Sequence, residues 1–355
     1  MKSLSFIQKV MYVLNVPFGL LLLFSYLANF INPSFIPFFG LLGLAYPILL
    51  GVNLLFVFIW LISLKKHIFF SMTCILIGLP QLGHLFQGNG QYKKMTSNNH
   101  AKVMTYNVRA FNYRLDEGWE EKTRGIDATI ESESPDILCI QEYRKFKGMP
   151  RFNYRYKHVY LKNNTFGLAI YSNYKIINKG TVDFETEGGN YQKFIYADLL
   201  LSKNDTVRII NAHLKSIGLD KTNLSHLKDS ELSQHEIEMQ KRKLIRPLLN
   251  AYKLRGKQTK VLSDFIKSTT LPIVFCGDLN DPPGTYAYHE ISKDLKDSFV
   301  HSGSGFSTTV PMFEKYYLPL RIDYILHDKK FKSFNYEVVH KEYSDHFPII
   351  VDLEY

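Results

Sequence analysis

The chain has 355 residues, of which 46% are hydrophobic and 21% are charged, and its formal net charge is +10. Residues 1–90 contain four lysines and no acidic residue, so 39 basic and 33 acidic residues follow, a net charge of +6. This composition excludes a disordered chain, and the uneven charge excludes one soluble domain over the whole length. The two parts of the chain are therefore expected to lie in different solvents.

The first 90 residues are predicted to be embedded in a membrane, because a span needs roughly 20 mainly apolar residues and charge near its centre is costly. Residues 10–31 form one candidate span, and residues 35–64 form a longer one that has to tilt or to bend, for example at Pro47. Residues 67–86 form a weaker third candidate, since a proline, a glutamine and a histidine lie near its end. An interfacial or re-entrant segment is the alternative for this third stretch.

The lysines of the apolar region indicate its orientation. Lys2 and Lys9 precede the first span, and Lys65 and Lys66 follow the second, which places both of these ends on the cytoplasmic side. Three spans then export the rest of the chain, whereas two lysines just after the third span argue mildly for the opposite. We expect an integral protein of the plasma or inner membrane with an extracytoplasmic domain. A cleaved signal peptide is the rival interpretation, but no small-residue cleavage pattern follows the first span.

Residues 88–100 are polar and contain glycine, which is typical of a short linker between a membrane region at 1–87 and a second domain at 101–355. Apolar periodicity predicts helices near 118–133 and 231–267. The second of these contains Pro247, at which it is expected to kink. The predicted strands are 102–107, 136–141, 166–172, 176–183, 193–201, 206–212, 273–276 and 321–326, and the stretch 344–351 leads into a last strand. Strands that occur both in runs and next to helices favour mixed sheets, and the length permits two packed sheets.

A basic helix segment and two cysteines each have both a structural and a functional interpretation. Residues 239–249 of the second long helix mix basic and apolar positions, so that anion binding and a solvated face are alternatives, of which the solvated face is preferred. Cys139 and Cys276 lie in apolar strand runs, where a cysteine usually behaves as a small hydrophobic residue. With three cysteines in the chain, two free core thiols are favoured over a disulfide between them.

Polar residues follow the predicted strands at their ends. In residues 272–280, an apolar strand exits into Asp278 and Asn280, which share a face if the extended conformation continues. A lone acid at such a place often caps a turn, but open sheets also place their sites at strand ends. The residues that stand at or beside the end of a predicted strand are Asn107, Glu142, His213, Asp278, Asn280, Asp323, Asp345 and His346.

Six short motifs in this order resemble those of the endonuclease/exonuclease/phosphatase family, the deoxyribonuclease I-like hydrolases, over residues 101–355. The motifs are Met104-Thr105-Tyr106-Asn107-Val108, Ile140-Gln141-Glu142, Asn211-Ala212-His213-Leu214, Gly277-Asp278-Leu279-Asn280, Arg321-Ile322-Asp323-Tyr324-Ile325 and Ser344-Asp345-His346. The resemblance implies an α+β fold in which two packed mixed β-sheets are flanked by helices as a four-layer sandwich, here preceded by transmembrane helices. It also implies a site for Mg²⁺, with Mn²⁺ as the alternative, at one edge of the sheets.

The resemblance assigns roles to the candidate residues. Glu142 is implied to be the principal metal ligand with Asn107 beside it, and Asp345 a further ligand. Asp278 is implied to orient and deprotonate the attacking water, while Asn280 and His213 contact phosphoryl oxygens. For Asp278 and Asn280, an Asx turn is the structural alternative.

The last pair, Asp323 and His346, resembles a hydrogen-bonded dyad in which the carboxylate holds the imidazole in one tautomer. For His346 alone, core packing is the alternative. Carboxylate and amide oxygens are ligands that suit Mg²⁺, which independently favours metal-assisted hydrolysis of a phosphate ester.

The preferred function is that of a membrane-anchored, metal-dependent phosphodiesterase, most of all a nuclease, because a basic domain suits a polyanion. A phospholipid phosphodiesterase and a phosphatase acting on a small phosphorylated molecule are alternatives, and a binding protein without turnover is the least favoured. The expected partners are the lipid bilayer and a nucleic acid or other phosphodiester, with no protein partner. Aromatic residues in the loops suit base stacking or ordinary packing, namely Tyr113, Tyr191, Phe306, Tyr316 and Tyr317.

Overall fold

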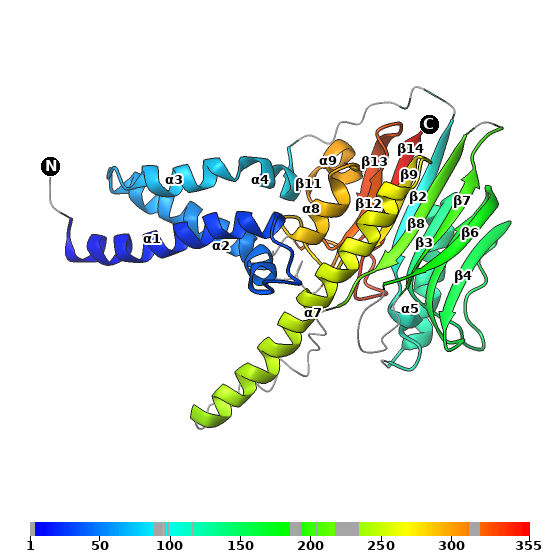
Figure 1. Cartoon of the computed structure of the whole chain (residues 1–355), viewed down its shortest axis with the longest axis horizontal. Coiled ribbons are helices and arrows are strands. Elements are labelled where there is room, and N and C mark those ends of the chain that lie inside the picture. Colours follow the sequence, from blue (N-terminus) through cyan, green and yellow to red (C-terminus); the bar gives the residue numbers. More distant parts are fainter. Residues whose placement is uncertain are drawn as a thin grey trace. The chain divides into compact units, whose positions relative to one another are not determined.

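A computed structural model of the protein describes residues 4–88, 95, 97, 99–115, 117–184, 193–203, 205–216, 234–311 and 320–355, without the side chains of residues 234–244. The longest stretches outside the described residues are 185–192, 217–233 and 312–319. The chain divides into two compact units (Figure 1). The first comprises Met1–Leu82, Lys215–Lys257 and Gly284–His289, and the second comprises Gly83–Leu214, Gln258–Pro283 and Glu290–Tyr355.

The first unit contains the apolar helices. They are α1 (Phe6–Tyr26), which continues into the turn η1 (Leu27–Asn29), α2 (Phe38–Ile62), and the pair α3 (Ile68–Ile77) and α4 (Leu79–Leu85). Two helices, Phe6–Asn29 and Phe38–Ile62, are long and apolar enough to cross a membrane. The pair α3 and α4 is bent by 66° and adds a third crossing if it forms one span. Helix α2 runs through Pro47 as one helix.

Buried polar side chains fix how these helices run. Helices α1 and α2 pack together as a hairpin, and α3 packs against both. Ser71 of α3 donates a hydrogen bond to Asn15 of α1 at 2.6 Å, and Asn29 after α1 donates one to Gln81 of α4 at 2.7 Å. Pairs of this kind fix the register of apolar helices, because a buried polar group needs a partner. The bent pair therefore runs parallel to α1 from Ser71 to Gln81.

The second unit contains two six-stranded mixed sheets. The first, in the order β10-β12-β9-β8-β7-β6, is formed by β6 (Lys175–Asp183), β7 (Lys193–Leu200), β8 (Thr206–His213), β9 (Ile273–Asp278), β10 (Lys296–Asp297) and β12 (Asp323–His327). The second, in the order β13-β14-β2-β3-β5-β4, is formed by β2 (His100–Asn107), β3 (Ile137–Arg144), β4 (Tyr156–Lys162), β5 (Phe166–Ser172), β13 (Lys332–Val338) and β14 (Ile349–Glu354). A small separate sheet pairs β1 (Phe86–Gln87) with β11 (Gly305–Phe306).

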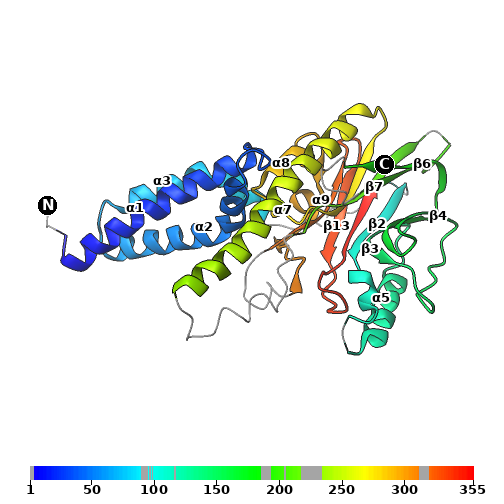
Figure 2. The ribbon, with the colours of Figure 1, turned by 60° about the horizontal axis from the view of Figure 1, so that its bottom comes forward.

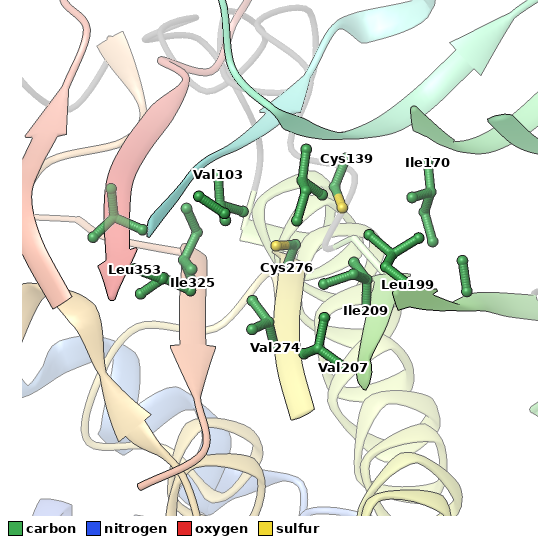
Figure 3. Close-up of a cluster of buried hydrophobic side chains, with 14 of the residues drawn as sticks. Val103, Cys139, Ile170, Leu199, Val207, Ile209, Val274, Cys276, Ile325 and Leu353 are labelled. Atoms are coloured by element: carbon green, nitrogen blue, oxygen red, sulfur yellow. The ribbon is translucent and has the colours of Figure 1, made fainter. Parts of the chain in front are cut away.

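The core lies between the two large sheets. Alternate side chains of both sheets meet there, as Figure 3 shows for Val103, Ile170, Val207 and others, and these side chains are almost completely buried. Cys139 and Cys276 are free thiols within this layer, which confirms the prediction of core cysteines.

Helices cover the outer faces of the sheets. Ile126 and Ile130 of α5 (Trp119–Glu133) pack on the sheet of β2 and β3. Phe265, in the second half of α7 (Gln234–Ser268), packs edge-on against Phe194 and at a tilt against Tyr196 of β7. The short helix α9 (Ser298–Ser302) packs against β12 and β13 (Figure 2), whereas α8 (Tyr286–Ser292) is divided between the two units. The expected sandwich of helix, sheet, sheet and helix is confirmed.

One polar side chain bridges the sheets through the core. The amide nitrogen of buried Asn211 on β8 donates to the carbonyls of Ile140 at 3.0 Å and Ala169 at 2.9 Å, and its oxygen accepts from Gln141 Nε2 at 2.7 Å. Removal of Asn211 breaks three buried hydrogen bonds, which costs about 3 kcal/mol.

We expect Asn211→Ala to lower the free energy of unfolding by about 3 kcal/mol, measured by denaturant unfolding of the second unit's tryptophan signal in the full chain. Asn178→Ala is the matched control, because Asn178 is exposed on β6 and makes one amide hydrogen bond, to Asp198 at 2.9 Å. Its cost should stay below about 1 kcal/mol. Equal costs for both variants would contradict a bridging role of Asn211.

Candidate functional site

Strand topology brings the predicted residues to one edge. In the first sheet, His213 at the end of β8 pairs in parallel register with Asp278 at the end of β9, and Asp323 at the start of β12 pairs with Asp278 from the other side. In the second sheet, Asn107 at the end of β2 pairs with Gln141 of β3. Parallel strands end at the same edge of a sheet, so both sheets deliver polar residues to one place.

Asp278 is the centre of this group. It is fully buried, and three nitrogen atoms approach its Oδ2: Asn107 Nδ2 at 3.1 Å, His213 Nε2 at 3.5 Å and His346 Nε2 at 3.8 Å. The preceding Gly277 permits this arrangement, because a Cβ there would overlap with the carbonyl of Ala212 on the adjacent strand. A buried carboxylate surrounded by donors has the ordered environment that a proton acceptor needs.

A β-bulge directs Glu142 towards the same place. The register between β3 and β5 shifts between Ile140 and Tyr143, and Glu142 has a φ of 52°, a conformation that costs free energy in a residue with a side chain. The bulge leaves Gln141 in the core and turns Glu142 to the edge, where its Oε1 accepts from Asn107 Nδ2 at 3.3 Å. The strained backbone thus supplies a partly exposed carboxylate next to Asp278.

Asp323 and His346 form the dyad predicted from the sequence. His346 Nδ1 lies 2.9 Å from Asp323 Oδ2, and both residues are buried. Burial raises the pKa of the Asp323 carboxyl to about 6 even though the imidazole opposes the shift. Burial lowers the pKa of His346, but Asp323 and Asp278 outweigh it, and the pKa ends well above its usual value. His346 is therefore held as a cation whose Nε2 faces Asp278.

Two predicted residues have a different environment from the one expected. Asn280 has a φ of 52°, which ends the extended conformation after Asp278. Its backbone N–H donates to Asp278 Oδ1 at 2.7 Å and its side chain donates to the carbonyl of Leu214 at 3.1 Å, so the Asx turn considered as an alternative is present. Asp345 is exposed and lies 3.4 Å from Arg109 Nε. The phosphate-binding role of Asn280 and the metal-binding role of Asp345 stay predictions.

Arg109 is a functional candidate that the motifs do not reveal. Residues 109–112 form a left-handed turn, in which φ lies between 45° and 57° and glycine is absent, so no turn signal marks it in the sequence. Arg109 N donates to Asn107 Oδ1 at 3.1 Å, and Asn112 donates to the carbonyl of Tyr343 at 2.7 Å. Such a turn costs about 1 kcal/mol or more per residue, and strain of this size is concentrated at functional sites. Here it brings a guanidinium to the site's edge.

We expect Arg109→Met to lower kcat/KM for a phosphate ester by roughly 10- to 100-fold, because a charged donor to a phosphoryl oxygen contributes about 1.5–3 kcal/mol. The measurement is steady-state hydrolysis with Arg155→Met as the control, since Arg155 is exposed just before the edge strand β4. A loss of the same size in both variants would indicate general electrostatics rather than a role of Arg109 at the site.

The donor set fits a divalent metal ion. Among the described residues, Asp278, Asp323 and His346 offer ligand atoms within 4.8 Å of one another. However, the facing atoms of Asp323 and His346 already bond to each other. Glu142 and Asp278 instead share one neutral amide donor, Asn107 Nδ2, and do not bond to each other. Glu142, Asp278 and Asn107 are therefore the residues that would hold an ion, and their oxygen ligands suit Mg²⁺.

Comparisons with known proteins agree with this geometry. The family model described as the Endonuclease/Exonuclease/phosphatase family matches residues 104–346, more than half of the chain. The chain belongs to this family. Members of the endonuclease/exonuclease/phosphatase family are hydrolases of phosphoester bonds and generally depend on a divalent metal. A second model, of a domain of unknown function, matches residues 8–85. No curated protein matches the chain.

Solved structures share the fold at low identity. The mannosyl-6-phosphatase of Bacteroides thetaiotaomicron has a TM-score of 0.53 and 17% identity, covering 72% of this chain and 100% of that one. TDP2 of D. rerio, humanized by 14 mutations, has a TM-score of 0.52 and 15% identity, covering 73% and 100%. The human Nocturnin catalytic domain has a TM-score of 0.50 and 18% identity, covering 73% and 94%. At these identities the likeness establishes the fold and not the substrate.

Proposed function

We propose that the protein is a membrane-anchored, divalent-metal-dependent phosphodiesterase that acts on nucleic acid. One observation carries the chemical part of this proposal. Both His213 Nε2, at 3.5 Å, and His346 Nε2, at 3.8 Å, lie near the same buried oxygen of Asp278, and Glu142 lies beside them. This set offers a proton acceptor, donors for phosphoryl oxygens and a metal-binding carboxylate within one small space.

Each residue has a distinct task in the proposed hydrolysis. Asp278 accepts the proton of the attacking water, while its second oxygen, Oδ1, is held by the N–H of Asn280 at 2.7 Å. His346, kept cationic by Asp323, donates from Nε2 to a phosphoryl oxygen, and His213 donates to another. Glu142, with Asp278 and Asn107, would hold the Mg²⁺ ion, which would supply neutralisation of the charge on the phosphoryl oxygens and on the departing alkoxide. The residues thus divide the work between proton transfer and charge stabilisation.

A cluster of aromatic and basic side chains favours a nucleic acid over other phosphodiesters. Tyr113 stacks on Phe146 with ring centroids 4.3 Å apart, and the guanidinium of Arg144 lies 5.0 Å from the Tyr113 ring. Arg144 ends the strand β3, two residues after Glu142, so the cluster adjoins the site. Planar faces next to cations suit stacked bases with their phosphates.

The other aromatic residues proposed for stacking are not part of the Tyr113 cluster as the structure describes it. Phe306 pairs with Phe86 at 5.0 Å and is 59% exposed, away from the Tyr113 cluster in the sheet of β1 and β11. Tyr191, Tyr316 and Tyr317 lie outside the described residues. Among the described residues, the Tyr113 cluster is therefore the feature that favours a nucleic acid.

A substrate panel tests the proposal. The full chain in detergent is incubated with plasmid DNA, a single-stranded oligonucleotide, labelled phospholipid vesicles and a phosphomonoester, with Mg²⁺ omitted and restored. We expect metal-dependent cleavage of DNA, with an affinity that falls as salt is added. Cleavage of vesicle lipid without nicking of DNA would instead favour a phospholipid phosphodiesterase, and cleavage of the monoester alone would favour a phosphatase.

The membrane anchor and its orientation form the second part of the proposal. The parallel course of α1 and the α3–α4 pair, fixed by Ser71 with Asn15 and Asn29 with Gln81, supports three crossings rather than a re-entrant segment. Three crossings put the end of α4 on the side opposite to Lys9. The basic residues before α1 and between α2 and α3 then suit the cytoplasm, which supports an extracytoplasmic catalytic domain.

Cysteine labelling tests the orientation, because the three native cysteines are buried. Lys66→Cys and Lys329→Cys, both at exposed positions, are treated with a membrane-impermeant maleimide in intact cells. We expect labelling at position 329 before permeabilisation and at position 66 only afterwards. The reverse order would place the catalytic domain in the cytoplasm.

A further inference from the structure

Basic residues are concentrated in α7 beyond Glu236 and Glu238, which lie near its start. Residues 239–257 contain seven basic residues and no acidic residue. Ile245 is 47% exposed, while Leu248 and Leu249 are half-buried, and these three side chains project from one side of the helix. Arg246 and Lys253 are exposed on the adjoining side. An exposed apolar strip beside a basic strip is characteristic of a helix at a membrane surface.

Close contacts attach this helix to the first turn of α2 and to the loop before it, within the first unit. The ring of buried Tyr252 lies against Gly40, where any side chain would overlap with it. One turn further, Gly256 packs against the turn that begins at Asn32, whose side chain accepts from the N–H of Ser34 at 2.8 Å. Both contacts need a glycine for the close approach. The position of α7 at this loop is therefore built into the packing.

The loop between two membrane-spanning helices lies at the membrane surface. Helix α2 begins at Phe38, so its contact at Gly40 is near the level at which the chain enters the hydrocarbon region. From Tyr252, the first half of α7 continues for about 27 Å to its start. Towards its start, the helix diverges from the α1–α2 hairpin (Figure 1). Leu249 and Lys253 lie within one turn of Tyr252, so the apolar and basic strips begin near the level of the lipid headgroups.

We propose that the first half of α7 binds the surface of the bilayer and takes anionic lipid headgroups as its ligands. This inference rests on the proposed membrane anchoring. The apolar strip at Ile245 enters the boundary of the acyl chains, while Arg246 and its neighbours pair with lipid phosphates. Pro247 lacks an N–H and interrupts the helical hydrogen bonds here, which lets the first turns follow the membrane surface. A solvated face, the interpretation preferred from sequence, leaves the apolar strip unexplained.

Fluorescence of the full chain in lipid nanodiscs tests this proposal. An environment-sensitive dye is attached to Ile245→Cys, to Leu55→Cys as a probe of the anchor, and to Lys260→Cys as a probe of an exposed position on the same helix. Nanodiscs contain phosphatidylcholine alone or with phosphatidylglycerol, and some lipids carry a quencher. We expect the dye at position 245 to be blue-shifted and quenched several-fold more than at 260, most of all with phosphatidylglycerol.

The variant Arg242→Gln, Lys243→Gln, Arg246→Gln measures the role of charge. Each basic residue near an anionic surface strengthens association about fivefold, so the triple variant should lose the preference for phosphatidylglycerol. If the dye at 245 stays in water while the dye at 55 is quenched, the proposal for α7 is wrong and the anchor is intact. If the dye at 55 is not quenched, both fail. An unchanged lipid preference in the triple variant would also overturn headgroup recognition.

Discussion

Glu142→Gln is expected to lower turnover of a phosphodiester by about 10³-fold or more while the protein stays folded. The substitution keeps the size of the side chain and its hydrogen bond with Asn107, which lies 3.3 Å away, but removes the charge that a metal ion requires. Glu142 is partly exposed, so the loss of charge does not leave a buried group unsatisfied. The free energy of unfolding should therefore change by less than about 1 kcal/mol.

A measurement of metal binding tests whether Glu142→Gln loses turnover because Glu142 is a metal ligand. Titration of the full chain with Mn²⁺, followed by its effect on nuclear relaxation of water, should show a much weaker site in Glu142→Gln than in the wild type. Glu133→Gln is the control, since Glu133 pairs with Lys102 at 3.0 Å at the end of α5. Unchanged Mn²⁺ affinity in Glu142→Gln, or turnover like that of the wild type, would remove Glu142 from the metal site.

Sequence periodicity predicted most of the fold because buried strands carry a strong signal. The apolar runs that became β3, β8 and β9 were predicted to within a few residues, since each is covered on both faces. The two-residue edge strand β10 was not predicted, and neither were the longer edge strands β4 (Tyr156–Lys162) and β13 (Lys332–Val338). Both mix charged and aromatic residues, because one face of an edge strand contacts solvent, and so they lack a regular apolar pattern. The order of the strands in each sheet also required the structure.

The candidate site was predictable in its composition but not in its geometry. Strand ends gave Asn107, His213 and Asp278 together with their shared edge. The bulge at Glu142 and the left-handed turn at Arg109 were not predictable, because neither contains a glycine and both are stabilised by contacts distant in sequence. Local propensity opposes these conformations, and tertiary hydrogen bonds, such as that of Asn112 with the carbonyl of Tyr343, overcome it.

The second large effect is expected at the dyad of Asp323 and His346. His346→Ala should lower turnover by about 10²–10⁴-fold, because it removes the cation that faces the phosphoryl group. It should also destabilise the protein by about 3–5 kcal/mol at pH 8, since the buried Asp323 loses its partner. Activity measured together with thermal unfolding of the full chain gives both values. The imidazole opposes the raised pKa of Asp323, so its removal raises this pKa further above about 6.

The sign of the pH dependence follows from this shift. In the variant, Asp323 has a higher pKa in the folded state than its value of about 4 in the unfolded state, so the folded protein binds a proton that the unfolded protein releases. Acidification from pH 8 towards pH 5 should therefore restore stability to His346→Ala, and activity should stay low throughout.

The double variant His346→Ala, Asp323→Asn separates stability from chemistry. A neutral amide needs no counter-charge in the buried site, so stability at pH 8 should recover relative to His346→Ala, and its gain on acidification should disappear. Turnover should remain as low as in the single variant, because the cation near Asp278 is still absent. If the double variant regained activity along with stability, His346 would be a structural partner of Asp323 rather than a group that contacts the substrate, and the proposed division of roles at this edge would be wrong.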